Sequence, residues 1–169
     1  MGDGTAKSQF ETIVERLTSA GVEFLVIGGR AEGLMGSPRV TYDTDLCYRR
    51  THENIERLAN ALKPLQPTLR GAPPGLPFRP DAQTLEMGTN FTFETIAGDL
   101  DLLGHVEPIG GYEELAKHAE TMDVGGVLLK VASLNDLIRI KRHVNRPKDR
   151  EALLHLLAIQ RVREDNRQL

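Results

Sequence analysis

The length and composition of the chain limit its class before any motif is considered. It has 169 residues, of which 40% are hydrophobic and 27% charged, a balance typical of a soluble globular protein with one core. No apolar run reaches the length that crosses a bilayer, and the N-terminal residues lack the apolar segment of a signal peptide. A single cysteine excludes an internal disulfide, so we expect a cytoplasmic protein without membrane contact.

Two amphipathic helices are expected early in the chain. The first begins after Ser8, which has Glu11 three residues later in the spacing of a capping box, and it ends at Gly21. The second covers residues 51–63 and ends before Pro64. Each carries an apolar stripe of helical period, so we interpret both as packing elements.

Between these helices, a strand runs directly into two glycines. Residues 22–27 are apolar and rich in β-branched side chains, as in a buried strand, and Gly28-Gly29 follows them. Residues 30–35 predict a short helix whose free N–H groups would point back over the glycines. A strand, a glycine turn and a helix N-terminus together make a good binding site for phosphate.

A second strand, over residues 41–48, carries Asp43 and Asp45. Side chains two apart on a strand share a face, so these two carboxylates stand side by side. Like charges at this distance need a cation between them, and Mg²⁺ accepts one or two carboxylates together with water and substrate phosphates. A solvated edge strand would carry the same Asp-Thr-Asp, and the pair alone does not decide between the two interpretations.

The middle of the chain is rich in proline. Residues 64–83 contain six prolines, a density that neither a helix nor a central strand tolerates. We therefore expect a long loop, in which Arg70 and Arg79 would face a phosphate group or an acceptor. A loop that merely crosses the surface is the equal alternative.

A pair of strands is expected after this loop. Residues 91–96 alternate apolar and polar side chains, and residues 99–103 form the partner strand beyond Gly98. Asp99 and Asp101 share a face of the second strand, so either could supply a third carboxylate.

The C-terminal part reads as a short helix over residues 112–118, a strand over residues 127–131 and two further helices. Ser133 caps the first of these, and Arg146-Pro147-Lys148-Asp149 begins the last, with the final seven residues frayed. The buried side of the last helix is expected to comprise Leu153, Leu154, Leu156, Leu157 and Ile159.

The charge of the chain is divided unevenly. From residue 136 onward there are nine Lys/Arg against five Asp/Glu, which gives +4, whereas the preceding part has twelve against nineteen, which gives −7. A basic region beside an acidic body suits a polyanionic partner, although an ordinary solvated helical face would look the same. Our hypothesis is that Lys141 contacts phosphate groups of a ligand and that its basic neighbours are available for a nucleic acid; these are Arg139, Arg142, Arg146, Lys148 and Arg150.

The segment from Gly28-Gly29 through Arg39 and Thr41 to Asp43-Thr44-Asp45 resembles the DNA polymerase β-like nucleotidyltransferase superfamily. With Lys141 and the Arg146-Pro147-Lys148-Asp149 motif, it resembles the small bacterial nucleotidyltransferases related to abortive-infection (AbiEii-type) toxins. Many members have Gly-Ser at the turn, whereas this chain has Gly-Gly. A phosphate contact from a serine hydroxyl must therefore come from backbone N–H groups here.

The resemblance implies roles for particular residues. Asp43, Asp45 and Asp101 would hold two Mg²⁺ ions, for which Mn²⁺ can substitute, and the glycine three residues before Asp101 favours it over Asp99. Asp99 would then be an exposed turn residue. The nucleotide phosphates would be bound by the remaining candidates, which are Gly28, Gly29, Arg39 and Lys141. For Arg39, an ordinary exposed cation is the equal alternative.

We expect an α/β (α+β) nucleotidyltransferase fold, in which helices flank a short mixed sheet. Residues 1–132 would form the catalytic core, and residues 133–169 a helical extension within one compact unit. The implied enzyme is a Mg²⁺-dependent transferase that moves a nucleoside monophosphate from an NTP such as ATP to RNA or tRNA, a protein hydroxyl or a small molecule such as an aminoglycoside. It could belong to a toxin–antitoxin pair with an antitoxin partner, or to a resistance system. The alternative is an inactive nucleotidyltransferase-like module that binds a partner subunit.

Overall fold

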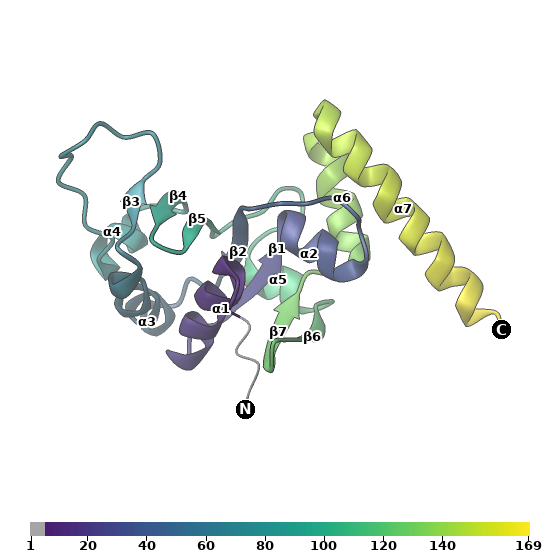
Figure 1. Ribbon diagram of the computed structural model, residues 1–169, viewed down its shortest axis with the longest axis horizontal. Helices are drawn as coiled ribbons and strands as arrows, with labels where there is room; N and C mark the ends of the chain where they lie inside the picture. The colour runs from purple at the N-terminus through teal and green to yellow at the C-terminus, as the bar shows by residue number, and fades with distance from the viewer. Residues whose placement is uncertain (1–5) are drawn as a thin grey trace.

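The computed structural model describes residues 6–169 and shows a single mixed sheet with helices around it (Figure 1). The seven strands lie in the order β3-β4-β5-β2-β1-β7-β6. They are β1 (Phe24–Ile27), β2 (Thr44–Tyr48), β3 (Thr68–Leu69), β4 (Asn90–Thr95), β5 (Gly98–Leu103), β6 (Glu120–Val124) and β7 (Val127–Val131). The expected α/β fold with a short mixed sheet is confirmed.

The helices fall before, between and after the strands of the sheet. They are α1 (Gln9–Ser19), α2 (Gly28–Met35), α3 (His52–Leu62), the 3-10 helix η1 (Lys63–Leu65), α4 (Ala82–Met87), α5 (Tyr112–Ala116), α6 (Leu134–Val144) and α7 (Pro147–Arg167). α7 packs on α6 and runs along the edge of the molecule to the C-terminus (Figure 1). None of the described helices is both long and apolar enough to cross a membrane.

Strands β4, β5 and β2 divide their side chains between two faces of the sheet. Phe93, Leu100 and Leu102 are fully buried and join the apolar sides of α1 and α3 in one core. The alternate positions carry acidic side chains on the opposite face, because the period of a strand is two residues. We call this the acidic face, and its members on these strands are Glu94, Asp99, Asp101 and Asp45.

Three expected element limits are corrected by the structure. α2 begins at Gly28 itself rather than after the glycines, and β2 begins at Thr44, so Asp43 lies just before the strand. Asp99 is a strand residue and not a turn residue, because the turn before β5 falls at residues 96–97. Asp99 and Asp101 therefore both point to the acidic face.

Two further differences concern longer segments. η1, β3 and α4 divide the proline-rich region, which leaves residues 71–80 as the proline-rich loop. The last helix does not fray after residue 162 but continues to Arg167. Leu154 was expected on its buried side and is instead 69% exposed, because α7 buries only the side that faces α6, where Ala152 and Leu156 lie.

Candidate functional site

Two carboxylates meet at the centre of the sheet. Asp45 on β2 and Asp101 on β5 are Cα partners in parallel, adjacent strands. Burial, followed by the interaction with Asp101 and repulsion from Asp43, raises the pKa of Asp45 to about 7. Asp101 Oδ1 is buried and accepts no hydrogen bond of good geometry. The pair is therefore an acidic site whose negative charge is incompletely compensated.

Gly28 brings the N-terminus of α2 against this pair. Its φ is +65°, and a Cβ atom at this position would lie 2.2 Å from Asp45 Oδ2. Only glycine meets both conditions, since other residues carry a Cβ and rarely adopt this φ. Residue Ile27 at the N-cap makes no side-chain hydrogen bond to the helix, so the first N–H groups of α2 are not capped by a side chain. Gly29 likewise lets the start of α2 pack closely on Thr41, because a Cβ atom added at this position would lie 2.9 Å from the Thr41 side chain.

The third predicted carboxylate, Asp43, is exposed and precedes β2. It is near enough to contribute to the raised pKa of Asp45. Within residues 6–169, however, no three His, Cys, Asp or Glu side chains come together as a group that could hold a metal ion. The structure therefore brings Asp45 and Asp101 together and leaves Asp43 at the rim, and the three-ligand site stays a prediction.

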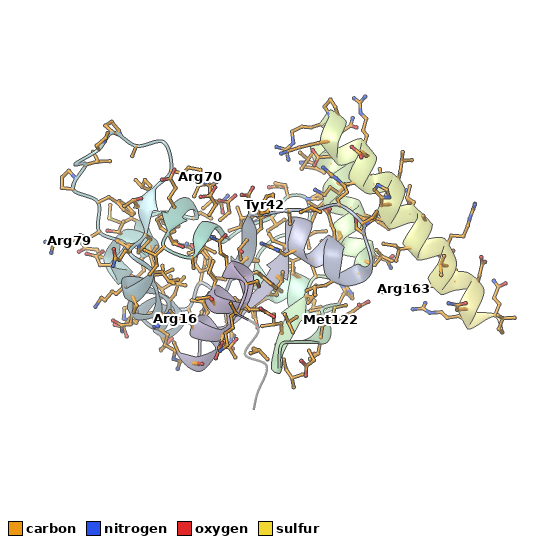
Figure 2. All side chains as sticks on the ribbon, in the orientation of Figure 1. Arg16, Tyr42, Arg70, Arg79, Met122 and Arg163 are labelled. Carbon is orange, nitrogen blue, oxygen red and sulfur yellow. The ribbon has the colours of Figure 1, made fainter. Side chains whose placement is uncertain are left out.

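Arg70 lies directly on the acidic face. Its guanidinium group is 2.9 Å from Asp101 Oδ1 and 3.4 Å from Asp99 Oδ2, and it donates a hydrogen bond of 3.0 Å to the carbonyl of Phe93. Figure 2 shows Arg70 where the proline-rich loop begins, on the same side of the molecule as Tyr42. The sequence pointed to Arg70 as a residue facing phosphate or acceptor, but its contact with both Asp99 and Asp101 required the sheet register.

Lys141 is held by two buried carboxylates. Its Nζ atom lies 2.8 Å from Glu32 Oε1 on α2 and 3.3 Å from Asp149 Oδ1 on α7. The side chains of Glu32 and Asp149 are only 3% and 1% exposed, and that of Lys141 is 16% exposed. Lys141 also lowers the pKa of Asp45, against the larger raising effects, so its charge is felt at the carboxylate pair. Sequence reasoning missed Glu32, whose one available signal was its position four residues after Gly28 on the same face of α2.

The remaining predicted cations are mostly engaged elsewhere. Arg39 donates a hydrogen bond of 3.0 Å to the carbonyl of Lys148, which ties the segment after α2 to the start of α7. Arg139 pairs with Asp136 at 3.3 Å, and Arg146 pairs with Asp149 at 2.7 Å. The predicted basic strip is therefore partly neutralised by its own acidic neighbours.

The chain has the nucleotidyltransferase fold, since solved structures of that fold are similar to it over most of its length. The lincosamide antibiotic adenylyltransferase LnuA in its lincomycin-bound form superposes with a TM-score of 0.62 at 12% identity, covering 92% of this chain and 98% of that one. The antibiotic-resistance factor ANT(2'')-Ia gives a TM-score of 0.56 at 15% identity, with 93% and 90% covered. An antigenic nucleotidyltransferase-like protein from Paracoccidioides brasiliensis gives 0.56 at 16% identity, with 88% and 73% covered.

These likenesses establish the fold. No protein-family profile matches the chain, and no curated protein matches it in sequence.

Proposed function

We propose that the protein is a nucleotidyltransferase, which moves a nucleoside monophosphate from an NTP to a hydroxyl group on an acceptor. The observation that supports this most directly is the pairing of Asp45 with Asp101, beside the N-terminus of α2 that starts at Gly28. A carboxylate pair suits a divalent cation, and free helix N–H groups suit phosphate. Both partners of a metal–nucleotide complex thus have a matching surface within one site.

The donor set fits Mg²⁺ better than a softer metal. The pair offers carboxylate oxygens alone, and one of them, Asp101 Oδ1, is shared with the Arg70 guanidinium at 2.9 Å. Mg²⁺ takes one or two carboxylates and fills its other positions with water and phosphate oxygens. Asp45 and Asp101 would hold the ion, and Asp43 would join them as a third ligand. Bound Mg²⁺ supplies positive charge to the attacking and departing oxygens.

The residues around the pair would divide the remaining tasks. The backbone N–H groups of Gly28 and Gly29 would bind the outer phosphates, and Lys141 would add positive charge beside them. The acceptor oxygen forms a bond to the α-phosphorus while the bond from that phosphorus to the bridging oxygen breaks. Pyrophosphate leaves with the electron pair of that bond, and the acceptor proton passes to the carboxylate of Asp101.

For the acceptor, we propose a small hydroxyl-bearing molecule rather than RNA or protein. ANT(2'')-Ia has been solved in complex with adenylyl-2''-tobramycin and LnuA with lincomycin, and both share this fold. The internal pairing of Arg139 and Arg146 leaves fewer cations for a polyanion than the sequence suggests. Both observations favour a small acceptor.

The test is incubation of the protein with Mg²⁺, each labelled NTP in turn, and separate pools of small metabolites and antibiotics, total RNA, and protein. We expect label in the small-molecule pool and release of pyrophosphate, and both should vanish in Asp45→Asn and Asp101→Asn. Asp99→Asn serves as the matched control on the same strand and should retain transfer. Label that survives in Asp45→Asn would overturn the proposal, and label confined to RNA or protein would reassign the acceptor.

A second candidate function follows from the Arg70 contact. The Arg70 guanidinium lies 2.9 Å from Asp101 Oδ1 and neutralises part of the charge of the site without a metal ion. An inactive module that binds a partner subunit would hold no metal and would need such a neutralising group. Thermal stabilisation by Mg²⁺ or Mn²⁺ that disappears in Asp43→Asn and Asp45→Asn would exclude this alternative. The toxin relationship is tested separately by co-expression with the product of the neighbouring gene, which should form a complex if it is an antitoxin.

A further inference from the structure

A cavity lies under the proline-rich loop, at the β3 edge of the sheet. It has a volume of about 400 Å³, which is in the range of small-molecule sites. The loop supplies an apolar wall that includes Leu76 and Phe78, and the opposite wall consists of β3 and Glu94 of β4. Phe78 is fixed by packing on Phe93, with ring centroids 5.9 Å apart. The cavity is therefore a preformed pocket with apolar side chains on the loop side and one carboxylate, that of Glu94, on the sheet side.

The sheet register places Glu94 on the same face as the proposed catalytic residues. Glu94 pairs with Asp99, and Asp101, two residues further along β5, pairs with Asp45. The usual spacing of strands and of residues along them puts the Cα atom of Glu94 about 8 Å from the Cα atom of Asp101. Phe78 packs on Phe93, which points to the core, so the cavity wraps the edge of the sheet and reaches the acidic face through Glu94.

Charge decides which ligand this surface accepts. Arg70 is shared between Asp99 and Asp101, and Glu94 has no ion-pair partner among residues 6–169. Together with the exposed Asp43, these groups give the acidic face an excess of negative charge. A cation is attracted to such a surface, whereas a polyanion such as RNA is repelled.

We propose that this cavity is the acceptor site, and that it binds a small organic cation whose apolar part fills the loop side while its ammonium group pairs with Glu94. The role of acceptor site rests on the proposed nucleotidyl transfer, whereas binding of the cation in the cavity does not. To act as an acceptor, the cation also needs a hydroxyl group that reaches Asp101, across the roughly 8 Å that separate the Cα atoms of Glu94 and Asp101. That oxygen would bond to the α-phosphorus as pyrophosphate leaves, with its proton passing to Asp101.

Binding can be tested without catalysis by a matched pair of probes. Phenylalaninol carries a phenyl ring and an ammonium group, and 3-phenyl-1-propanol is its uncharged analogue. Phenylalaninol is too short to place its hydroxyl at Asp101, so it reports occupation of the cavity alone. Both are titrated into the isotope-labelled protein and followed by two-dimensional NMR.

We expect phenylalaninol to bind about five- to tenfold more tightly than the neutral probe, with shifts confined to residues 68–78 and 94. Glu94→Gln should remove that preference, Leu76→Asn should weaken both probes, and the exposed control Glu151→Gln should change neither. Asp45→Asn should also leave binding unchanged, although it abolishes transfer. Failure of the transfer assay alone would therefore leave this site standing. Equal binding of the two probes, no binding, or an unchanged preference in Glu94→Gln would overturn it.

Discussion

At the scale of single residues, the site depends on one glycine more than on any other backbone position. Gly28→Ala would force a Cβ to within 2.2 Å of Asp45 Oδ2 at a φ of +65°. We expect a loss of about 1–3 kcal/mol in unfolding free energy and loss of nucleotidyl transfer, because Asp45 must move. Chemical denaturation and pyrophosphate release measure the two effects.

The control for this variant lies in the same helix. A Cβ at Gly33 would meet nothing within 4 Å, and its φ is not positive. Gly33→Ala should therefore stabilise the protein by about 0.5–1 kcal/mol with transfer retained. If both variants behaved alike, the special role assigned to Gly28 would be wrong.

The raised pKa of Asp45 makes the stability of the protein depend on pH. Because the folded pKa is about 7 and the ordinary value is 3.8, the folded protein binds more protons than the unfolded chain between these limits. The contribution of the neutral Asp45 side chain to the unfolding free energy is fully present below about pH 4 and is lost as the pH rises through 7. The side chain of the Asp45→Asn variant stays neutral at every pH. The unfolding free energy of this variant should therefore exceed that of the parent by on the order of 2 kcal/mol at pH 8 and match it near pH 4.

This comparison is made by urea denaturation in the presence of EDTA. Addition of Mg²⁺ at pH 8 should raise the stability of the parent but not that of the variant. A difference between the two proteins that does not change with pH would contradict the assigned pKa.

Arg70 competes with any metal ion for Asp101. Arg70→Gln removes the guanidinium that lies 2.9 Å from Asp101 Oδ1, so we expect Mn²⁺ to bind about three- to tenfold more tightly. Electron paramagnetic resonance of free Mn²⁺ measures this directly. Arg79→Gln is the matched control, because this arginine at the other end of the proline-rich loop is exposed and contacts neither Asp99 nor Asp101. Weaker Mn²⁺ binding in Arg70→Gln would mean that Arg70 supports the metal site.

At the scale of elements, α2, α6 and α7 are joined by one buried ionic cluster. Lys141→Met would leave Glu32 and Asp149 buried without their shared cation, at a cost of about 3–5 kcal/mol. Asp149 shows how far the cluster favours ionised groups: burial alone would raise its pKa, but the hydrogen bonds from Arg146 and Lys141 lower it to about 2. Thermal denaturation of Lys141→Met checks the prediction.

Two comparisons separate the cluster from a general effect of charge. Lys148→Met removes an exposed lysine from the start of α7 and should change stability by less than about 0.5 kcal/mol. Lys141→Met combined with Glu32→Leu should recover part of the loss, since one unpaired carboxylate is then absent. A loss of transfer in Lys141→Met is informative about phosphate binding only after folding of that variant has been established.

The elements that sequence predicted well are those with local signals. The Ser8 and Ser133 caps and the strand at residues 127–131 follow from residue types within a few positions. α4 and the exposed side of α7 were missed, because helix formation near prolines and burial of Leu154 depend on which neighbours pack against them. Local patterns do not carry that information.

At the scale of the whole molecule, the candidate site was predictable where strand register could be inferred. The preference for Asp101 over Asp99 agrees with the Cα pairing of Asp101 with Asp45, although the ligand role itself stays a prediction. Arg70 on Asp101 and Glu32 on Lys141 join positions 31 and 109 residues apart, and no spacing rule links them. The predicted basic strip was weakened for the same reason, since Arg139 and Arg146 find acidic partners only once the helices form.

The division of β4 and β5 into a buried side and an acidic side has a consequence for how such a protein can diversify. Phe93 and Leu100 are fully buried, so changes there threaten folding itself. Thr92 and Glu94 are exposed on the other side of β4, and substitutions there cost little stability. The chemistry of the face beside Asp101 can therefore drift through single mutations, while Asp45, Asp101 and the folded core are inherited unchanged. A scaffold of this kind is well suited to acquiring new ligands.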